Sequence, residues 1–188
     1  MRILISECEI RQRVTELGAA ISEEYAGKPL TVLGVLTGSV ILLADLIRAT
    51  SVPLRVALIQ ASSYPGARME AGPLSVDRSL VPDLNQRDVL ILDDIFDTGR
   101  TMLGLISVVQ EYRPRSLRSA VLLWKTARTC VDLRPDYFGF SIPDEFVVGY
   151  GLDFNDEFRH LPYIAVPDEA DLAEARRSAA SCSPGNNG

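Results

Sequence analysis

The chain has 188 residues, of which 47% are hydrophobic and 23% charged, and its formal net charge is −6. This composition is typical of one globular domain over residues 1–188 and argues against a disordered or membrane-embedded chain. The acidic charge gives no general attraction for nucleic acid. The longest apolar runs, such as residues 40–44, are too short to span a bilayer. We therefore expect no membrane or nucleic-acid partner.

The cysteine content is low and scattered. Cys8, Cys130 and Cys182 are widely spaced and form no CxxC pair, which argues against both a disulfide framework and a zinc site. The N-terminal sequence also has no secretory signal pattern. A cytoplasmic location is the resulting expectation.

The first predicted element is an amphipathic helix at residues 6–25. Apolar residues recur there at helical spacing from Ile10 to Ile21. The Ala-Gly-Lys-Pro cluster at 26–29 ends the helix, so residues 1–28 form an N-terminal helical segment that packs on a sheet.

Residues 30–36 are predicted to form the first central strand, because they are apolar and partly β-branched. The strand stops at the small residues Thr37, Gly38 and Ser39, and a helical period then begins at Val40. This is one strand–turn–helix unit, and its turn is a weak candidate for an anion-binding loop.

A further strand is predicted at 54–61, followed by a polar, Gly- and Pro-containing stretch at 62–73. Long loops inside a compact domain are usually functional or disordered. The stretch at 62–73 is therefore either a lid over a site or a plain surface hairpin. Residues 76–87 are expected to form an irregular connection.

The stretch at 89–102, VLILDDIFDTGRTM, carries the strongest functional pattern. Four apolar residues predict a strand buried on both faces, and a helical period predicts a helix at 101–112. Asp93, Asp94 and a polar turn lie between these elements. A strand that ends in acids, followed by a Gly-containing turn and a helix, is the usual ligand site of an open α/β sheet. The free N–H groups at the helix start favour a phosphate.

The acids of this stretch have simpler alternatives. Asp93 and Asp94 could be solvated residues at a strand end, Asp97 a helix N-cap, and Thr98 and Thr101 ordinary helix-start residues. Adjacent carboxylates repel each other, however, and carboxylates suit sugar hydroxyl groups, a metal ion or a substrate proton.

Two chemical roles compete for Asp97. It is either a nucleophile that takes a phosphoryl group, or a group below the anomeric carbon of a bound sugar 5′-phosphate. The second role fits the spacing better, because a phosphatase nucleophile follows its strand directly and Asp97 lies deeper in the turn.

The remaining predicted elements complete an α/β domain with a central, mainly parallel sheet flanked by helices. They are strands at 119–124, 135–140 and 146–152, a C-terminal helix at 167–179 with acids first and arginines last, and a disordered tail at 180–188.

Residues 89–101 resemble the phosphoribosyl-pyrophosphate (PRPP) signature of the type I phosphoribosyltransferases, four apolar residues followed by acid-Asp-x-x-Asp-Thr-Gly-x-Thr. The resemblance is to the hypoxanthine-guanine phosphoribosyltransferases in particular. Residues 35–39 (VLTGS) are similar to the pyrophosphate loop of that family, and Ser63-Tyr64 resembles its mobile lid. Residues 135–166 match its purine-binding and C-terminal segment nearly throughout. The resemblance covers roughly residues 30–166.

This resemblance implies a type I phosphoribosyltransferase fold with a small purine-binding hood at 135–166. It also implies the Mg²⁺-dependent transfer of a phosphoribosyl group from PRPP to a 6-oxopurine, hypoxanthine or guanine, in purine salvage. A homodimer or homotetramer is the implied assembly.

The resemblance further implies a role for individual residues. Asp97 is the expected general base. The expected PRPP and 5′-phosphate set is Asp93, Asp94, Asp97, Thr98, Gly99, Arg100 and Thr101. The pyrophosphate set is Thr37, Gly38 and Arg159, and the lid residues are Ser63 and Tyr64. The purine set is Ile95, Lys125, Phe146, Val147 and Asp153, and the Mg²⁺ ligands are Asp93, Asp94 and Asp153.

One departure from the family pattern concerns Thr37. Those enzymes commonly carry Lys or Arg at this position, so pyrophosphate binding would rely on loop N–H groups, Mg²⁺ and Arg159. The peptide bond at this position can be cis in the family, and a cis Leu36–Thr37 bond is therefore expected.

Alternatives to the implied roles stay open at this point. Taken alone, Lys125 would be a solvated lysine at a strand end, Phe146 a core residue and Arg159 a surface charge, and His160 is expected at the surface without a ligand role. For the protein as a whole, the alternatives are a nucleotide-sensing regulator that binds RNA or DNA, and an enzyme that prefers xanthine or adenine. The net charge of −6 argues against the regulator, and Lys125, a donor, argues against adenine.

Overall fold

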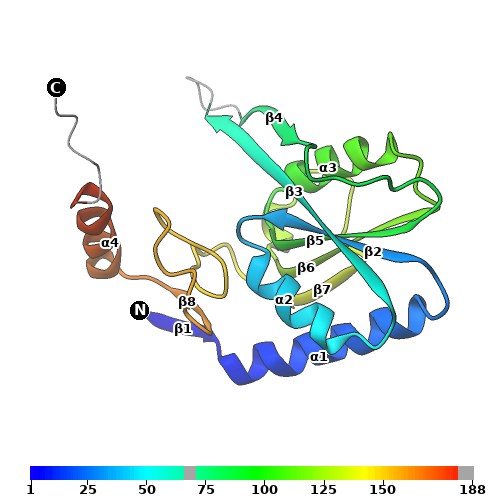
Figure 1. Ribbon diagram of the computed structural model, residues 1–188. Helices are drawn as coiled ribbons and strands as arrows, with labels where there is room; N and C mark the ends of the chain where they lie inside the picture. Colours follow the sequence, from blue (N-terminus) through cyan, green and yellow to red (C-terminus); the bar gives the residue numbers. More distant parts are fainter. Residues whose placement is uncertain (66–70, 182–188) are drawn as a thin grey trace.

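The structure is a computed structural model (Figure 1), which describes the backbone of residues 1–65 and 71–181 and the side chains of residues 1–61 and 75–177. The strands are β1 (Arg2–Ile5), β2 (Leu30–Leu36), β3 (Leu54–Pro65), β4 (Ala71–Asp77), β5 (Asp88–Phe96), β6 (Ser116–Trp124), β7 (Tyr137–Ser141) and β8 (Ile164–Val166). The helices are α1 (Glu7–Glu24), α2 (Val40–Ala49), α3 (Arg100–Gln110) and α4 (Glu169–Ser181), with a 3-10 turn η1 at Thr126–Arg128.

The central sheet has six strands in the order β4-β3-β2-β5-β6-β7. All neighbours are parallel except β3 and β4, which are antiparallel. From β2 the chain first adds β3 on one side and later returns to add β5 on the other side. The strand order therefore reverses between β2 and β5, and an open α/β sheet binds its ligands at the carboxyl ends of the strands at such a point.

Helices cover both faces of this sheet, with α1 and α2 on one face and α3 on the other (Figure 1). Side chains of β5 alternate between the two cores. Leu90 and Leu92 pack in the cluster of α1 and α2, whereas Val89 and Ile91 pack in the cluster of α3. The apolar run at the start of β5 is thus buried on both faces, as predicted, and the α/β fold class is confirmed.

Helix α1 begins where its sequence provides a capping box. The Ser6 hydroxyl accepts from the Glu9 amide at 3.4 Å, and the Ser6 amide donates to Glu9 Oε2 at 2.8 Å, which satisfies two of the backbone donors that a helix start leaves free. The predicted helix at 6–25 is confirmed. Residues 1–28 also contain β1, a short strand that was not predicted because four residues carry too little periodicity.

A smaller unit lies beside the carboxyl edge of the sheet (Figure 1). In it β1 pairs antiparallel with β8, and the Tyr150 hydroxyl donates to Asp45 of α2 at 2.7 Å. The strand predicted at 146–152 is wrong, since only single bridges form there, Val148 with Ala165 and Gly149 with Leu152. Positive φ angles at residues 149–151 turn the chain too sharply for a strand.

Two further expectations need correction. Residues 62–65 and 71–73 are not loop, because they belong to β3 and β4, which pair antiparallel as in the hairpin alternative. Residues 180 and 181 belong to α4 and not to a tail, and the rest of the predicted tail lies outside the described residues. Among the helices that the structure describes, none is both long and apolar enough to cross a membrane.

The start of β5 is held by a buried ion pair. Asp88 is 3% exposed and accepts from Arg115, with Nε at 3.2 Å from Oδ1, and from the Ser116 hydroxyl at 2.6 Å. The hydrogen bond from Arg115 is the main reason that the pKa of Asp88 lies below its ordinary value.

We predict that Asp88→Asn lowers the free energy of unfolding at pH 7 by about 1–2 kcal/mol, the lower part of the range for hydrogen bonds to a charged group, because Arg115 is half-exposed. The pKa of Asp88 is lower in the folded state than the unfolded-state value of ~3.9, so its carboxylate stabilises the fold above about pH 3.9. This stabilisation is lost as the pH falls through the folded-state pKa. The difference in the free energy of unfolding between variant and wild type, measured by urea unfolding, should therefore become smaller below about pH 4. Asp132→Asn, at an exposed acid, is the control. An Asp88→Asn gap that stays constant from pH 7 to pH 3 would rule out the ion pair as the cause.

Candidate active site

Two adjacent carboxylates at the carboxyl end of β5 form the floor of the candidate site. Asp93 is 8% exposed, and its Oδ1 accepts from the Asp94 amide at 3.0 Å. Burial raises the pKa of Asp93 well above its ordinary value, and the charge of Asp94 adds to this. Burial also raises the pKa of Asp94. The solvated strand-end alternative is therefore wrong, and the pair is an arrangement that a cation or hydroxyl donors would stabilise.

The turn after β5 opens onto the start of α3. Gly99 is the N-cap at φ +83°, and an added Cβ would lie 2.6 Å from the Phe96 ring, so only glycine fits. Asp97 is consequently not the N-cap. The Arg100 amide donates to Thr98 Oγ1 at 3.4 Å, whereas the amides of Thr101 and Met102 have no acceptor among the described residues. Free amides at a helix start favour an anion.

A hollow of 190 Å³ lies over this turn. It is lined by Asp93, Asp94, Ile95, Phe96, Asp97, Thr98, Gly99, Thr101 and Met102. The backbone amide of Arg100 belongs to the same turn, although its side chain is exposed. All members of the PRPP set predicted from the sequence except Arg100 thus line one hollow.

The loop after β2 comes close to the two acids. The Leu36–Thr37 bond is cis, as expected, and Thr37 is exposed. A Cβ on Gly38 would lie 1.6 Å from Asp94 Oδ2, so the chain can pass beside this carboxylate only because residue 38 has no side chain. The loops after β2 and β5 therefore meet where the strand order reverses.

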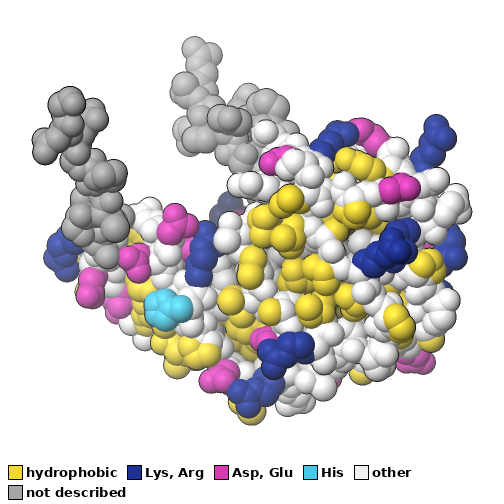
Figure 2. Space-filling view, viewed as in Figure 1, with side chains coloured by type: hydrophobic (Ala, Val, Ile, Leu, Met, Phe, Trp, Pro, Cys, Tyr) yellow, Lys and Arg dark blue, Asp and Glu magenta, His cyan; other side chains and the backbone are white. Residues whose placement is uncertain are grey.

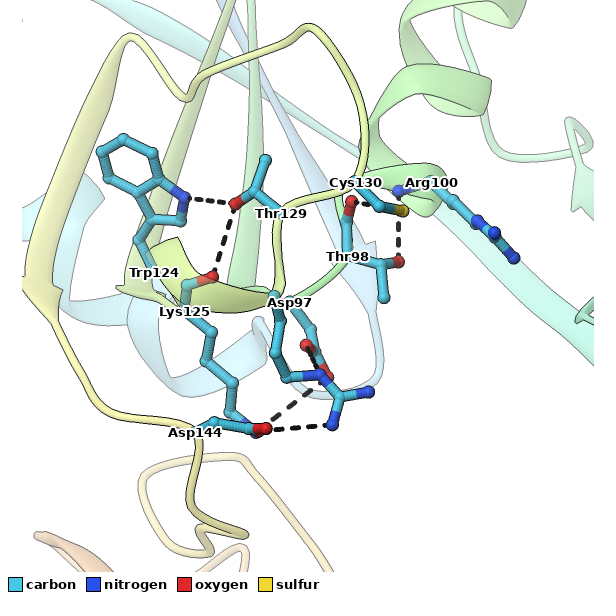
Figure 3. A network of polar contacts seen from close by, with 9 residues as sticks. Asp97, Thr98, Arg100, Trp124, Lys125, Thr129, Cys130 and Asp144 are labelled. Atoms are coloured by element: carbon cyan, nitrogen blue, oxygen red, sulfur yellow. Dashed lines mark hydrogen bonds and ion pairs between the residues drawn. The ribbon is translucent and has the colours of Figure 1, made fainter.

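Lys125, the first residue of the predicted purine set after the turn, lies on the side of Asp97 away from Thr98 and Arg100 (Figure 3). Lys125 is 6% exposed, so the solvated-lysine alternative is wrong. Phe146 is 50% exposed and lies edge-on to Phe154 with ring centroids 5.9 Å apart. The alternative of a core residue is therefore wrong for Phe146. The backbone of Val147 makes no hydrogen bond within the described part of the chain.

Asp97 has one oxygen that lacks a hydrogen bond. Its Oδ1 is buried, and no described donor meets it with hydrogen-bond geometry, although Arg128 Nε lies 2.7 Å away. The contact is thus a charge contact with poor alignment. Arg128 also donates to Asp144 Oδ1 at 3.3 Å, and this bond, followed by the charge of Asp97, raises the pKa of Arg128.

The predicted pyrophosphate and metal residues from the hood are tied to each other. Arg159 donates to the Gly151 carbonyl at 2.8 Å and pairs with Asp153 Oδ1 at 2.9 Å. Asp153 Oδ2 accepts from the Asp156 amide at 2.9 Å. No three acidic, His or Cys side chains of the described residues gather as a metal cluster. Asp153 is not brought into one group with Asp93 and Asp94.

Two predicted features lie apart from this geometry. Ser63 and Tyr64 are in β3, and their side chains lie outside the described residues. His160, the one histidine of the sequence and the cyan side chain in Figure 2, is exposed, as expected. It lines a larger cavity of 640 Å³ between α1, α2 and residues 159–162, which shares only Arg159 with the predicted site and lacks the acids and the phosphate turn.

Arg128 and Asp144 were not found from the sequence. Both contact the candidate site, from η1 and from the segment before Phe146. No spacing signal links an arginine and an acid 16 residues apart in different loops, so only the fold could show that they meet.

Comparisons with known proteins agree on one family. Residues 6–155 match the family model for the phosphoribosyl transferase domain. A hypoxanthine-guanine phosphoribosyltransferase of Staphylococcus epidermidis is 40% identical over 162 residues, which cover 86% of this chain and 90% of the relative. A hypoxanthine phosphoribosyltransferase of Salmonella typhimurium is 40% identical over 87% of this chain and 93% of its own length.

Solved structures show the same likeness in three dimensions. The crystal structure of a hypoxanthine phosphoribosyltransferase from Staphylococcus aureus superimposes with a TM-score of 0.85 at 37% identity, and covers 89% of this chain and 91% of that one. A hypoxanthine phosphoribosyl transferase of Trypanosoma cruzi gives a TM-score of 0.86 at 36% identity, over 95% and 96% of the two chains. The fold is therefore that of the type I phosphoribosyltransferases, as the resemblance implied.

We predict that Gly38→Ala lowers the free energy of unfolding by about 1–3 kcal/mol, the usual cost of overpacking, because the new Cβ would collide with Asp94 Oδ2. The loss should nearly vanish in an Asp94→Ala background, where the colliding atom is absent. Urea unfolding of the two single variants and the double variant measures this. An equal loss in both backgrounds would show that the Gly38–Asp94 approach is not the cause.

Proposed function

This chain belongs to the phosphoribosyltransferase family, and we propose that it transfers the 5-phosphoribosyl group of PRPP to a 6-oxopurine, hypoxanthine or guanine. The products would be IMP or GMP and pyrophosphate, as in purine salvage. The observation that carries the proposal is one hollow at the sheet edge, lined by the start of α3 with its free amides and by the buried acids of β5, with the buried Lys125 within 4.0 Å of Asp97 in the same turn.

PRPP is proposed to bind over the turn between β5 and α3. The amides of residues 98–101 hold the 5′-phosphate at the helix start, where free donors and the helix dipole both favour an anion. Asp93 and Asp94 accept hydrogen bonds from the ribose hydroxyls. The amides of Thr37 and Gly38 and the Arg159 guanidinium face the pyrophosphate, and the absence of a cation at Thr37 leaves Arg159 as the charged side chain of this set.

The purine is proposed to bind between Phe146 and Ile95. Stacking on an aromatic ring is worth roughly 1–3 kcal/mol for a nucleobase. Lys125 donates to the 6-oxo oxygen, and the backbone of Val147 contacts the edge of the base. An amino group at position 6 could not accept from Lys125, so this arrangement favours hypoxanthine, guanine or xanthine over adenine.

In the proposed reaction Asp97 Oδ1 accepts the proton of the purine imidazole ring. The ring nitrogen then forms its bond to C1′ as the bond from C1′ to the pyrophosphate oxygen breaks, and the electron pair of that bond leaves with pyrophosphate. The buried Oδ1 of Asp97 lacks a donor, so a purine N–H supplies the missing hydrogen bond. Water must be excluded from the oxocarbenium-like state, and Ser63 and Tyr64 stay the predicted lid.

Mg²⁺ is the proposed cofactor. The buried pair Asp93 and Asp94 fits a divalent cation, because two repelling carboxylates with raised pKa values are stabilised by positive charge. Mg²⁺ usually takes one or two carboxylates together with substrate phosphates, and Asp93 and Asp94 would hold one in this way. Asp153, which lies outside their group, would help to hold a Mg²⁺ bound to the pyrophosphate. When bound, it would supply positive charge to the leaving pyrophosphate. A cytoplasmic homodimer or homotetramer completes the proposal.

The test of the function is a spectrophotometric assay with PRPP, Mg²⁺ and each of hypoxanthine, guanine, xanthine and adenine. We expect nucleotide formation with hypoxanthine or guanine and none with adenine. Turnover of xanthine alone would identify a xanthine-preferring enzyme. No turnover of any purine, together with salt-sensitive RNA binding, would favour the regulatory alternative.

We predict that Asp97→Asn lowers kcat for hypoxanthine by about 10²–10⁴-fold, the usual contribution of a general base, because an amide cannot accept the purine proton. The KM for PRPP should change little, since the phosphate amides and the β5 acids remain. Steady-state kinetics against both substrates measure this, and Asp132→Asn, an exposed acid, is the matched control. Full turnover by Asp97→Asn would remove Asp97 from its role as the base.

A further inference from the structure

The Lys125 ammonium lies between two acids but does not bond directly to either. Its Nζ is 4.0 Å from Asp97 Oδ2 and 3.9 Å from Asp144 Oδ1, which is too long for a hydrogen bond. Charge-assisted N–H···O bonds are normally about 2.7–2.9 Å. A buried ammonium beside two carboxylates is attracted to both of them. Some other group must therefore hold the carboxylates away from it.

Arg128 is the group that contacts both carboxylates. Its Nε lies 2.7 Å from Asp97 Oδ1 and its Nη1 3.3 Å from Asp144 Oδ1, both shorter than the distances from Lys125. The network alternates in charge, and Arg128 competes with Lys125 for the same two acids (Figure 3). The planar guanidinium can pair with two acids at once, whereas Lys125 reaches neither.

The turn that carries Arg128 is fixed at both ends. The Arg128 amide donates to the Lys125 carbonyl at 3.0 Å, and the Cys130 amide donates to the Thr98 carbonyl in the phosphate turn at 3.1 Å. Thr129 Oγ1 accepts from Trp124 Nε1 at 3.0 Å. The base of the Arg128 side chain is thus set relative to β6 and to the phosphate turn, and the guanidinium reaches Asp97 from a defined position.

We propose, on the basis of the function proposed above, that Arg128 together with Asp144 is a positioning pair that keeps Asp97 and Lys125 apart. A lysine and an aspartate that form a direct ion pair use their donors and acceptors on each other, and these are then not available to a ligand. Held apart by Arg128, the Lys125 ammonium is left for the 6-oxo oxygen. Asp97 Oδ1 is contacted by Arg128 without hydrogen-bond geometry, so it still lacks a hydrogen-bond donor and is left for the ring proton. Arg128 itself need not touch the purine or PRPP.

The test uses Arg128→Ala in the full chain. Without the guanidinium, Asp97 should close on Lys125, so kcat/KM for hypoxanthine should fall by about 10–100-fold, the equivalent of a hydrogen bond to a charged group. The KM for PRPP should stay within about twofold. Arg128→Lys should recover only part of the loss, since an ammonium does not bridge two acids as a guanidinium does.

The matched control is Arg118→Ala. Arg118 is 41% exposed and pairs with Glu24 at 3.3 Å, against 44% exposure for Arg128, but it lies at the opposite end of β6. The control should keep the wild-type kcat/KM. An Arg128→Ala enzyme with wild-type kcat/KM, or one in which the KM values for PRPP and purine rise equally, would overturn the proposal.

A ligand-free crystal structure of Arg128→Ala provides a readout that does not depend on activity. The proposal expects Lys125 Nζ at about 2.7–2.9 Å from Asp97, and an unchanged separation of 4.0 Å would overturn it. A wild-type protein without any purine turnover would instead refute the proposed function. The crystal structure of Arg128→Ala would still test whether Arg128 keeps Asp97 and Lys125 apart.

Asp144→Asn serves if Arg128→Ala fails to fold, because Asp144 is 53% exposed and its loss should be tolerated. With one acid neutral, Arg128 should shift fully onto Asp97 and cover the oxygen that the purine needs. The KM for hypoxanthine should then rise at least about threefold at an unchanged KM for PRPP. An unchanged KM for hypoxanthine would overturn the proposal.

Discussion

The side-by-side burial of Asp93 and Asp94 at the end of β5 is the constraint on which the rest of the site depends. Desolvation raises the pKa of both carboxylates, and the charge of Asp94 adds to the shift of Asp93, so burial and mutual repulsion both disfavour the charged form of this pair. Such a site persists only where the surrounding structure is rigid. The rigidity comes from β5, whose preceding residues are buried in both cores. The same constraint requires glycine at residue 38, because a side chain there would occupy the space of Asp94 Oδ2.

The two halves of the candidate site are built from different groups, backbone amides in one and side chains in the other. The half proposed to bind phosphate consists of backbone amides at the start of α3, whose positions are set by the helix and by Gly99. The half proposed to bind the purine includes the long side chains of Lys125 and Arg128, which both lie near the Asp97 carboxylate. Fixed backbone donors suit a phosphate group, because the phosphate does not differ from one phosphoribosyl substrate to another. Side chains that can rearrange suit the part of the ligand that must be distinguished from close relatives.

The elements with strong periodicity were predicted well. The helix at 6–25, the strand at 30–36 and the buried strand before Asp93 were all confirmed, since local patterns and burial agreed. The hood was predicted less well. Residues 146–152 read as a strand because they are apolar, but positive φ angles at Gly149, Tyr150 and Gly151 break the chain into bridges. Strand β1 was missed because it has four residues and its partner, β8, lies at the other end of the sequence.

The sequence by itself determined the strand–turn–helix unit that is proposed to bind phosphate, because all of its parts are adjacent in the chain. It also determined the family, since the signature and the segment at 135–166 are long and specific. Only the tertiary structure decided that Lys125 is buried, that Phe146 is exposed, and that Arg128 contacts both Asp97 and Asp144. These facts depend on contacts between η1, the hood and the end of β5. No local pattern records such contacts, because side chains from separate loops meet only after the sheet has set the loops beside each other.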